Sequence, residues 1–510
     1  MGMPLRPALT SLTVTAVFRE TALARGESVA LTDGHTSCTY TQLLSRSDQL
    51  AAALHALGLV RGDRLALLSE NRLEYIELEL AAARLGLIVA CLNWRLGDEE
   101  LHHCIRLVSP ALMVLSPRYA DTATRIDHGV ARTLTLGPAF EQWRSEAVPG
   151  LRECPPDPED GLVILYTSGT TGLPKGALIS QRAMVARAQV FAQDYGITAS
   201  DGFIAWSPLF HMAATDHALA TLMLGGKVIV HDGLDVQRLC STLAQEQIGW
   251  LVAVPGMIEP LIDGLRRGQP SLRSPRVVGA MADLVPPHQI AELTALTGAP
   301  YMNSFGSTET GLPPASAGLL APGEVPGRLS KRCSALCTVR LVNADGDEVP
   351  DGVTGELVVS GPTLFSGYWG VARTPGQTLD FADGGFHMGD LMVRHADGSM
   401  DFVDRLRYLI KSGGENIYPA EIERVLLAHP GVREAAVVRK RDAQWGEVPV
   451  AFVACSDPAL DAPALLTWCS ARLSRYKIPK EIRLVDEAAL PRSSTGKVQR
   501  HEIERQWQLT

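Results

Sequence analysis

Residues 166–176 read Tyr-Thr-Ser-Gly-Thr-Thr-Gly-Leu-Pro-Lys-Gly, a run of hydroxyl and glycine residues that ends in a lysine and a further glycine. A short apolar run, Leu162–Tyr166, precedes it, and a second run, Ala177–Ser180, follows it. Both runs have the length of buried strands, so the sequence predicts a strand–loop–strand unit. Glycines let backbone N–H groups approach a ligand closely, hydroxyls add donors and the lysine adds charge. The loop is therefore predicted to hold a polyphosphate.

This loop differs from the Walker phosphate loop in two respects. A helix follows the Walker loop, whereas a strand-like run follows this one, and the spacing of glycine, lysine and hydroxyl residues is also different. The simple alternative is a surface loop rich in Ser, Thr and Gly that binds nothing. Other motifs along the chain decide between the two interpretations.

Composition indicates an ordinary globular protein. The chain has 510 residues, of which 46% are hydrophobic and 20% charged, and its formal net charge is −9. This negative charge argues against a general surface for nucleic acid, so a polyanion has to be held locally. The nine cysteines lack zinc spacing, which is typical of reduced thiols in a cytosolic protein. No apolar run is long enough for a transmembrane helix. We expect a cytoplasmic protein. The sequence leaves undecided whether it forms a homodimer.

Helical and strand-like apolar patterns alternate along the chain. Helical spacing over Tyr40–Gly58 is followed by a strand-like run at Arg64–Leu68. A second helical segment, Glu74–Leu85, is followed by a buried-strand pattern at Leu87–Leu92. Repeated units of this kind predict an α/β fold in which helices cover mixed or parallel sheets.

A domain boundary is predicted where the strand-like run Ser399–Val403 gives way to a charged segment. We expect a large N-terminal domain of layered βα subdomains over residues 1–404, a hinge at 405–407 and a small α+β domain over 408–510. The hundred or so residues after the boundary carry their own helix and strand patterns, which is enough for a separate small domain.

Five further segments place polar groups where secondary-structure propensity does not require them. A single Ser/Thr/Gly loop is a weak signal, but six segments of this kind in one chain form a specific set. The five are Pro208–Met212, Asn303–Thr310, Gly385–Asp390, Asp404–Glu423 and Pro491–Arg500.

At these residues the chain resembles the acyl-adenylate-forming (AMP-binding) superfamily, and it is most similar to fatty-acyl- and aryl-CoA ligases. The resemblance extends over nearly the whole chain, with the segments in the expected order. It implies that a carboxylate attacks the α-phosphate of ATP, which gives an acyl adenylate and pyrophosphate. Because an anion attacks a triphosphate, catalysis is mostly charge neutralisation and positioning. The resemblance also implies Mg²⁺ as a cofactor and coenzyme A as a co-substrate.

The same resemblance implies a role for each residue of a nucleotide site. Lys497 would meet the attacking carboxylate and the α-phosphate, Thr308 would contact the α-phosphate, and Glu309 would bind Mg²⁺, with Thr167 as a weaker metal ligand. Phe305 stands where tyrosine is usual, and its ring face still suits stacking on adenine. The residues implied in nucleotide binding are Thr167, Ser168, Gly169, Thr170, Thr171, Gly172, Lys175, Ser304, Phe305, Gly306, Asp390 and Arg405.

Simpler structural roles stay open for several of these residues. Asp390 would accept hydrogen bonds from the ribose hydroxyls, or it would be a turn residue after Gly389. Arg405 would contact ribose or phosphate, or it would form a salt bridge at the domain boundary. Glu309 and Lys497 could instead be solvated loop side chains.

The second half-reaction implies a mobile C-terminal domain and a tunnel for coenzyme A. Members of the superfamily rotate the small domain between half-reactions, and Arg407 stands where the hinge residue is usually Asp or Lys. Ser412, Gly413 and Gly414 match the loop that lines the pantetheine tunnel, although a flexible turn between strand and helix would have the same composition.

Two segments are implied in the acyl pocket. His211 stands where amino-acid-activating domains generally carry Asp, so it argues against an amino acid; it is a candidate catalytic or gating residue, or a core histidine. Met281 replaces a usual small residue and either narrows the pocket or fills a gap in the core. Asp216 and His217 could contact a polar group of the substrate, but we expect them to face solvent from a helix. The pocket residues are Phe210, His211, Met212, Gly279 and Met281.

The sequence therefore predicts an enzyme, an AMP-forming carboxylic acid:CoA ligase that acts on a fatty, aromatic or alicyclic acid. One alternative is an acyl-adenylating enzyme that loads the phosphopantetheine arm of a carrier protein. A second alternative is a nucleotide-binding relative without turnover, which the intact residues Thr308, Glu309, Asp390 and Lys497 argue against. The identity and chain length of the acid stay open.

Overall fold

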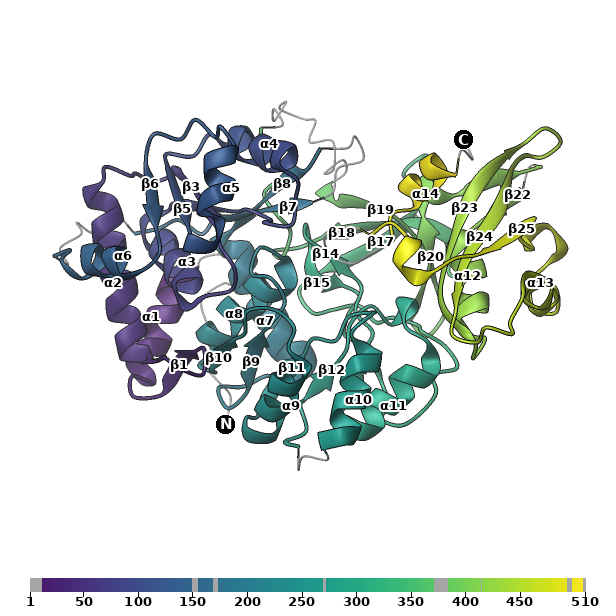
Figure 1. Cartoon of the computed structure of the whole chain (residues 1–510), viewed down its shortest axis with the longest axis horizontal. Helices are drawn as coiled ribbons and strands as arrows, with labels where there is room; N and C mark the ends of the chain where they lie inside the picture. Colours follow the sequence, from purple (N-terminus) through teal and green to yellow (C-terminus); the bar gives the residue numbers. More distant parts are fainter. Residues whose placement is uncertain are drawn as a thin grey trace.

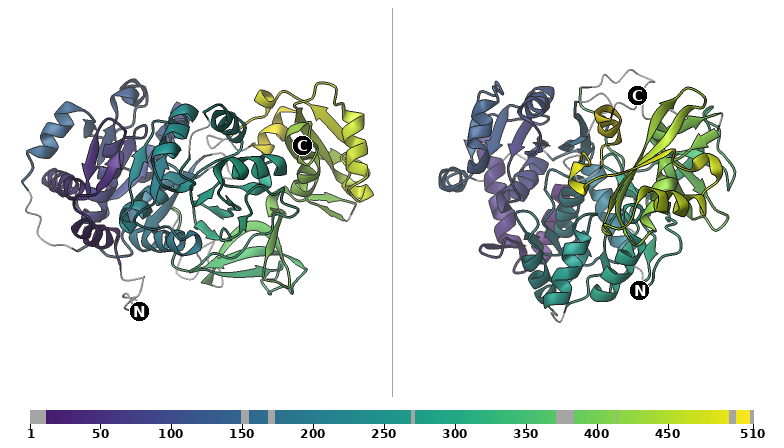
Figure 2. Two further views of the ribbon diagram at one scale, coloured as in Figure 1. Left: turned by 90° about the horizontal axis from the view of Figure 1, so that it is seen from below. Right: turned by 45° about the vertical axis from the view of Figure 1, so that its right-hand side comes forward.

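The computed structural model describes residues 12–148, 155–167, 173–268, 272–370, 384–413, 415–492 and 498–507. These residues form five β-sheets with helices packed against them. The N-terminal residues make up the larger part of the molecule, and the C-terminal residues form a smaller part at one end of its long axis (Figures 1 and 2). The structure confirms the predicted α/β class with a large N-terminal and a small α+β C-terminal part.

A six-stranded sheet carries the predicted phosphate loop. Its order is β6-β5-β3-β4-β7-β8, and every neighbouring pair is parallel except β7–β8. The apolar runs of β3, β4 and β7 are buried along almost their whole length, as helices on both faces of a parallel sheet require. The strands are β3 (Arg64–Leu68), β4 (Ile88–Cys91), β5 (Leu112–Leu115), β6 (Thr133–Thr135), β7 (Gly161–Thr167) and β8 (Lys175–Ser180).

An eight-stranded sheet forms the second layer, in the order β16-β13-β12-β11-β9-β10-β1-β2. It is parallel from β13 to β1, and only the outer strands β16 and β2 run antiparallel. The strands are β1 (Val29–Thr32), β2 (Ser37–Thr39), β9 (Gly202–Ala205), β10 (Val228–Val230), β11 (Ile248–Leu251), β12 (Val277–Val278), β13 (Tyr301–Met302) and β16 (Leu319–Leu320).

Helices between and around these sheets unite them into one hydrophobic core. Leu65 of β3, Leu219 of α8 and Trp250 of β11 all belong to a single buried cluster. Several helices begin at side-chain caps; Thr39 and Gln42, for example, form a reciprocal capping box at α2. The helices are α1 (Val14–Ala24), α2 (Tyr40–Ala56), α3 (Leu73–Leu85), α4 (Asp98–Val108), α5 (Ala120–Arg125), α6 (Pro138–Ser145), α7 (Gln181–Tyr195), α8 (Met212–Leu224), α9 (Val236–Gln245), α10 (Ile258–Gly268) and α11 (Pro287–Thr297).

Two antiparallel units follow the parallel layers. A short hairpin pairs β14 with β15, and a four-stranded sheet has the order β17-β18-β19-β20. Both lie in the middle of the molecule in Figure 1, between the parallel sheets and the C-terminal part. The strands are β14 (Gly306–Ser307), β15 (Gly311–Pro314), β17 (Thr338–Val342), β18 (Thr354–Ser360), β19 (Phe386–Arg394) and β20 (Met400–Arg405).

The C-terminal part has its own sheet and its own buried clusters. Its sheet has the order β22-β21-β24-β23, and β25 pairs with β24 in parallel. Ile422, Val437 and Leu465 lie in one of its two hydrophobic clusters. The elements are β21 (Ile410–Ser412), β22 (Glu415–Ile417), α12 (Pro419–Leu427), β23 (Val432–Asp442), β24 (Gly446–Cys455), α13 (Ala462–Ser470), β25 (Glu481–Leu484) and α14 (Arg500–Gln506).

The elements that local patterns predicted are present with small shifts at their ends. The helix expected over 40–58 is α2, the helix expected over 74–85 is α3, and the strand expected at 64–68 coincides with β3. Within the described ranges, we find no helix with the length and apolar character that crossing a membrane requires.

Candidate active site

The predicted strand–loop–strand unit is formed by β7 and β8. Tyr166 pairs with Gly176 and Thr167 with Lys175, so Thr167 and Lys175 lie opposite each other where the loop leaves the sheet. The Tyr166 hydroxyl donates to the Cys104 carbonyl oxygen (2.8 Å), which anchors this end of β7 to α4. The predicted phosphate contacts Ser168, Gly169, Thr170, Thr171 and Gly172 lie outside the described residues.

A segment from elsewhere in the chain covers the free edge of β8. Residues 366–369 run beside β8 through three backbone hydrogen bonds, and Tyr368 pairs with Ala177 in antiparallel fashion. Alternate residues of a strand share one face, so Lys175 and Ala177 point to the same side. The Lys175 Nζ atom accordingly lies 5.0 Å from the centroid of the Tyr368 ring.

The β14–β15 hairpin holds Thr308 and Glu309 in a tight turn. The Ser307 backbone N–H donates to the Thr310 hydroxyl (2.9 Å). Gly306 approaches the opposite strand so closely that a Cβ atom would lie 2.0 Å from the Gly311 carbonyl oxygen. A side chain at position 306 would push the two strands apart, and this explains the glycine there.

Arg187 of α7 fixes this turn through a hydrogen bond to its backbone. Its guanidinium donates to the Thr308 carbonyl oxygen (3.1 Å), to the Thr363 carbonyl oxygen (3.0 Å) and to Asp216 Oδ2 (2.9 Å). The Arg187 and Asp216 side chains are each only 3% exposed. Burial raises the pKa of Asp216, and the nearby guanidinium offsets part of that increase. Arg187 thus ties α7, α8 and the turn together.

Glu309 has two further contacts that fix its position. Its backbone carbonyl oxygen accepts a hydrogen bond from the Phe365 N–H (2.8 Å). The Tyr368 hydroxyl donates to Glu309 Oε1 (2.6 Å). Lys175 and Glu309 therefore both contact Tyr368, and the structure brings the first and the third of the predicted motifs together.

Phe305 lies beside a buried lysine and the antiparallel sheet. The Phe305 and Phe402 rings are 5.5 Å apart, which joins this loop to β20. Lys331 is fully buried, and its Nζ atom lies 5.9 Å from the Phe305 ring. Lys331 also contacts Asp283 Oδ2 (2.5 Å), which compensates its charge, and it donates a hydrogen bond to Asn303 Oδ1 (2.6 Å).

Asp390 and Arg405 are cross-strand neighbours in β19 and β20. They pair directly in the register, and Arg405 Nε lies 3.0 Å from Asp390 Oδ1. Asp390 is nearly buried, whereas Arg405 is partly exposed. The salt bridge considered for Arg405 is therefore present, and Asp390 is its partner. A ribose role for these two residues stays a prediction.

The Pro208–Met212 segment is held at the end of β9 by Asn71. The Asn71 side chain donates to the Ala205 and Ser207 carbonyl oxygens and accepts from the Leu209 N–H (2.8 Å). The buried Phe210 ring contacts Trp94 edge-on at 5.8 Å and His211 at 4.5 Å. Met212 begins α8.

The Gly279–Met281 segment is constrained from three sides. Trp250 Nε1 donates to the Gly279 carbonyl oxygen (2.8 Å), and the Tyr301 hydroxyl donates to the Ala280 carbonyl oxygen (2.8 Å). The Met281 N–H donates to Ser304 Oγ (2.9 Å), which connects this segment to the adenine-binding candidates. Gly279 has φ = 92°, and a Cβ atom there would lie 2.2 Å from the Tyr301 ring. Met281 itself is left-handed, with φ = 50°.

The expectation that Asp216 and His217 face solvent is wrong. Both are buried, because α8 lies between the two parallel sheets and is covered on all sides. His217 is surrounded by the rings of Phe191, Phe203 and Trp250, at 4.6, 5.8 and 4.4 Å. Burial lowers the pKa of His217 to about 3, so the imidazole is neutral at physiological pH.

The coenzyme A candidates make their contacts within the C-terminal part. Ser412 pairs with Glu415 and Gly446, and the Gly413 N–H donates to the Trp445 carbonyl oxygen (2.8 Å). The hinge candidate Arg407 donates to the Tyr408 hydroxyl (2.7 Å). The remaining C-terminal candidates, Gly414 and Lys497, lie outside the described residues.

The chain just beyond Lys497 is attached to α12 and to Asp404, which directly precedes the predicted hinge. Arg500 Nη2 contacts Glu423 Oε2 of α12 (2.5 Å), and Arg500 Nη1 is 4.0 Å from Asp404 Oδ1. Asp404 also accepts the Ala420 N–H (2.7 Å) at the start of α12. Burial raises the pKa of Asp404 to about 6, although the Arg500 charge acts in the opposite direction.

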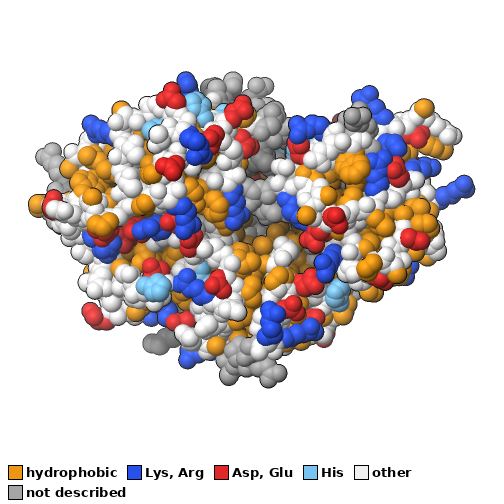
Figure 3. Space-filling view, in the orientation of Figure 1, with side chains coloured by type: hydrophobic (Ala, Val, Ile, Leu, Met, Phe, Trp, Pro, Cys, Tyr) orange, Lys and Arg blue, Asp and Glu red, His pale blue; other side chains and the backbone are white. Residues whose placement is uncertain are grey.

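The surface is hollowed between the larger N-terminal part and the C-terminal part, close to β14 and the ends of β7 and β8 (Figures 1 and 3).

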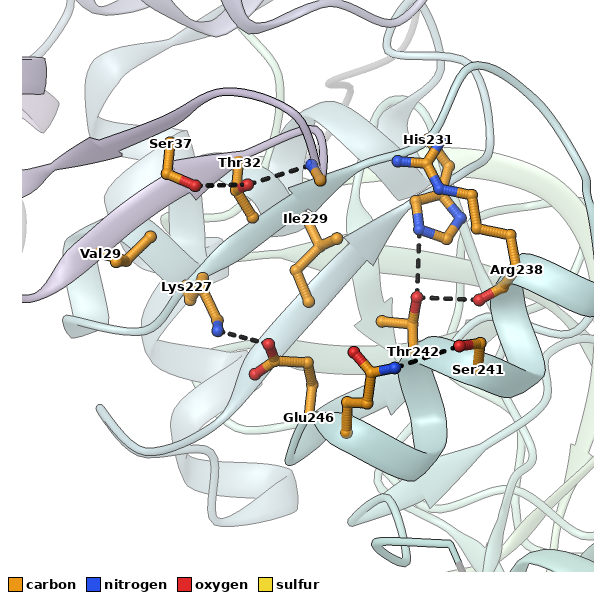
Figure 4. Close-up of a pocket in the computed structure, with 12 residues that line it drawn as sticks. Val29, Thr32, Ser37, Lys227, Ile229, His231, Arg238, Ser241, Thr242 and Glu246 are labelled. Atoms are coloured by element: carbon orange, nitrogen blue, oxygen red, sulfur yellow. Dashed lines mark hydrogen bonds and ion pairs between the residues drawn. The ribbon is translucent and has the colours of Figure 1, made fainter. Parts of the chain in front are cut away.

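A separate cavity of about 340 Å³ lies between the β1–β2 hairpin, β10 and α9 (Figure 4). There Lys227 pairs with Glu246 at 2.6 Å. Of the described residues that line this cavity, none was predicted as a site residue, so it is distinct from the candidate active site.

Sequence reasoning did not identify four residues that hold the site together. Arg187, Asn71 and Lys331 lie in ordinary stretches, and no local pattern marks them. Tyr368 follows Gly367 in a Gly-Tyr-Trp-Gly run whose composition suggests a turn, and this is the only signal that could have drawn attention to it. All four act on segments remote in sequence.

The chain belongs to the AMP-binding enzyme family. The model for this family matches residues 18–369, and the model for the AMP-binding enzyme C-terminal domain matches residues 421–497. The match confirms the resemblance drawn from the six motifs.

Two relatives and one solved structure illustrate the similarity. Feruloyl-CoA synthase of an Amycolatopsis species is 34% identical over 94% of this chain and 96% of the relative. Indoleacetate–CoA ligase of Aromatoleum aromaticum is 34% identical over 91% of this chain and 92% of the relative. The o-succinylbenzoate CoA synthetase of Bacillus subtilis, solved with its acyl-adenylate intermediate, is 27% identical with a TM-score of 0.82 over 96% and 97% of the two chains.

Replacing Arg187 alone should destabilise the protein strongly. Arg187→Met leaves the buried Asp216 carboxylate without its partner, and we expect the free energy of unfolding to fall by about 3–5 kcal/mol. The double variant Arg187→Met/Asp216→Leu removes both charges and should recover most of that loss, while the bond to the Thr308 carbonyl stays broken. Denaturant unfolding measures the stabilities, and a single variant as stable as the wild type would contradict this account.

His217 should make the protein sensitive to mild acid. The pKa of this imidazole is about 3 in the folded chain against 6.5 as a reference, so between these values the unfolded state binds one more proton. The free energy of unfolding then falls with decreasing pH by up to about 1.4 kcal/mol per unit below pH 6.5. His217→Phe keeps the ring and removes this dependence. A stability difference between the two proteins that is constant from pH 8 to pH 4 would refute the assignment.

Proposed function

We propose that this chain is an ATP-dependent carboxylic acid:CoA ligase that forms an acyl adenylate and then an acyl-CoA. The observation that carries the proposal is the arrangement of Lys175 and Glu309 around Tyr368 at the mouth of the β7–β8 loop. A cation and a carboxylate that both contact one tyrosine suit a metal-bound triphosphate, because the lysine attracts phosphate oxygens and the carboxylate attracts the metal.

The first half-reaction uses residues of the N-terminal part. The substrate carboxylate attacks the α-phosphorus of ATP, the bond to the β-phosphate breaks and pyrophosphate leaves. Lys175 and the loop after Thr167 would hold the departing phosphates, Thr308 would contact the α-phosphate and the Phe305 ring would stack on adenine. Lys497 would stabilise the charge that develops at the α-phosphate, where one preorganised donor has a large effect on rate.

Mg²⁺ fits the chemistry of the residues present. When bound, it neutralises phosphate charge. Among the described residues no group of three or more His, Cys, Asp or Glu side chains is arranged to hold a metal. Mg²⁺ is commonly bound through one or two carboxylates together with substrate phosphates, and Glu309 offers such a carboxylate, with Oε1 held by Tyr368.

In the second half-reaction the thiol of coenzyme A attacks the acyl carbonyl carbon and AMP leaves. We propose that the small domain, residues 408–510, turns about a hinge at 405–407 that includes Arg407. The loop at Ser412, Gly413 and Gly414 would line the path of the thiol. The separate hydrophobic clusters of the C-terminal part support a domain that moves as a unit.

An aromatic acid is the substrate class that the available observations favour. The names of the relatives refer to feruloyl, indoleacetate and, for a Bacillus licheniformis enzyme 31% identical to this chain, 2-succinylbenzoate. Aromatic side chains also surround the acyl-pocket candidates: Trp94 contacts Phe210, and Trp250 and Tyr301 bond the Gly279 segment. Flat rings pack well against such walls.

A carrier protein is the alternative acyl acceptor. A fatty acid–[acyl-carrier-protein] ligase of Streptomyces coeruleorubidus is 30% identical over 93% of this chain. Both acceptors present the same phosphopantetheine thiol, so the residues around the acyl adenylate do not distinguish them. We also propose a cytoplasmic location, which the eight free cysteines among the described residues support.

A screen of acids should identify the reaction. Pyrophosphate release from ATP is followed with ferulate, indoleacetate, 2-succinylbenzoate and fatty acids of several lengths, each with and without coenzyme A. We expect an aromatic acid to be the best substrate and to yield its CoA thioester, which mass spectrometry detects. Acid-dependent pyrophosphate release without a thioester would contradict the ligase and favour the carrier-protein alternative.

Removing the Lys497 charge should slow adenylate formation about 10²–10³-fold, because one preorganised donor to a developing oxyanion is lost. The measurement is acid-dependent pyrophosphate release by Lys497→Ala at saturating ATP. Lys227→Ala serves as a matched control, since Lys227 pairs with Glu246 beside the cavity of Figure 4. Equal rates in both variants would remove Lys497 from the mechanism.

A further inference from the structure

We propose that Tyr368 is a positioning residue that couples the phosphate-binding lysine to the metal-binding carboxylate. Its hydroxyl holds Glu309 and its ring carries Lys175. The inference rests on the proposed function, because it assigns Tyr368 a part in binding the metal–ATP substrate. Tyr368 itself touches neither reacting atom in this scheme; it acts through the two side chains that it orients.

The backbone fixes Tyr368 before any side-chain contact is made. Residues 366–369 are joined to β8 by hydrogen bonds of 2.7, 3.0 and 2.7 Å. The neighbouring Phe365 N–H donates to the Glu309 carbonyl oxygen (2.8 Å), so one short segment is attached both to β8 and to the Glu309 turn. The Phe365 ring meets the Tyr368 ring edge-on at 5.0 Å, which restricts the rotation of Tyr368.

The hydroxyl contact selects one orientation of the Glu309 carboxylate. Glu309 is buried to about nine-tenths, and its Oε1 atom accepts the Tyr368 hydroxyl at 2.6 Å. This distance lies at the short end of the range for O–H donors, so the contact orients both groups firmly. With Oε1 held, rotation of the carboxylate is restricted, as it is for metal-binding carboxylates that are held by an outer hydrogen bond.

The ring contact keeps the Lys175 charge in place without neutralising it. An ammonium group over a tyrosine ring is attracted by the negative face of the ring. In the parts of the chain that the structure describes, neither Lys175 nor Glu309 forms an ion pair within 4 Å. A direct Lys175–Glu309 pair would cancel both charges, and the ligand would then have to break it. Tyr368 instead holds both charges ready for a ligand.

The competing explanation is that Tyr368 only packs against Phe365 and closes the edge of β8. Two substitutions separate the explanations. Tyr368→Phe keeps the ring and removes the hydroxyl that bonds Glu309, whereas Tyr368→Leu removes both the hydroxyl and the ring. The matched control is Tyr40→Phe, because the buried Tyr40 hydroxyl also donates hydrogen bonds, to the Leu222 and Gly226 carbonyl oxygens, but at the α2–α8 contact.

Metal binding is measured directly and without turnover. Mn²⁺ is titrated into the protein with ATP and no acid, and bound Mn²⁺ is read by electron paramagnetic resonance. We expect Tyr368→Phe to weaken Mn²⁺ binding about 10–100-fold, the usual effect of losing an outer hydrogen bond to a metal ligand. Binding of pyrophosphate without metal should be unchanged in this variant, since the ring still carries Lys175.

Tyr368→Leu should show both defects. Besides weaker Mn²⁺ binding, its affinity for metal-free pyrophosphate should fall about two- to thirtyfold, the range expected from a lost cation–π contact. Tyr40→Phe should bind Mn²⁺ and pyrophosphate like the wild type, even if it unfolds at a lower temperature. If Tyr368→Phe binds Mn²⁺ as tightly as the wild type, or loses metal-free pyrophosphate binding equally, the coupling role is overturned.

These outcomes are distinguishable from a failure of the proposed function. If no acid supports pyrophosphate release by the wild type, the ligase proposal fails, yet the Mn²⁺ titration still tests Tyr368. If the wild type forms acyl-CoA and Tyr368→Phe shows the wild-type dependence of rate on Mg²⁺ concentration, only the inference about Tyr368 fails. A shift of that dependence to about tenfold or higher Mg²⁺, with the rate restored at saturation, supports it.

Discussion

Arg187 is a buried cation that joins segments far apart in the chain. It contacts Asp216 on α8 and the backbone carbonyl oxygens of Thr308 and Thr363. A charge in this environment needs such partners, because removal from water without them is costly. The Thr308 carbonyl directly precedes Glu309 in the turn, and the Thr363 carbonyl lies five residues before Tyr368. Arg187 therefore holds the backbone close to both residues. The geometry of the candidate site therefore depends on this one guanidinium, which is itself buried.

In the candidate site, a positive and a negative side chain are oriented by the same tyrosine without forming an ion pair in the described residues. Lys175 and Glu309 are both oriented by Tyr368 and are not paired with each other among the described residues. Asp390 and Arg405 are paired directly on adjacent strands, as are Lys331 and Asp283 beneath Phe305. Paired charges support the loops, whereas the unpaired ones remain available to a triphosphate and its metal. This division suits a family whose first reaction brings an anion to a polyanion.

Much of the fold and part of the site could be predicted from local patterns. The apolar runs around residues 166–176 became β7 and β8 because short buried runs of this kind have few alternatives to a strand. The same reasoning failed for Asp216 and His217. Their polar character suggests exposure, but α8 lies between two sheets, where Arg187 compensates Asp216 and three rings enclose His217. Burial of this kind depends on partners outside the helix.

The sequence by itself determined the two strands around the predicted phosphate loop, the alternation of helices and strands and the family, because each of these depends on short runs of residues that are adjacent along the chain. Only the tertiary structure decided that Tyr368 lies between Lys175 and Glu309 and that Arg187 supports the turn. The physical reason is that these contacts join segments that are far apart along the chain: Tyr368 is 59 residues from Glu309 and 193 from Lys175, and Arg187 is 121 residues from Thr308. Their geometry follows from the pairing of residues 366–369 with β8 and from the packing of α7 on α8, which no local periodicity encodes.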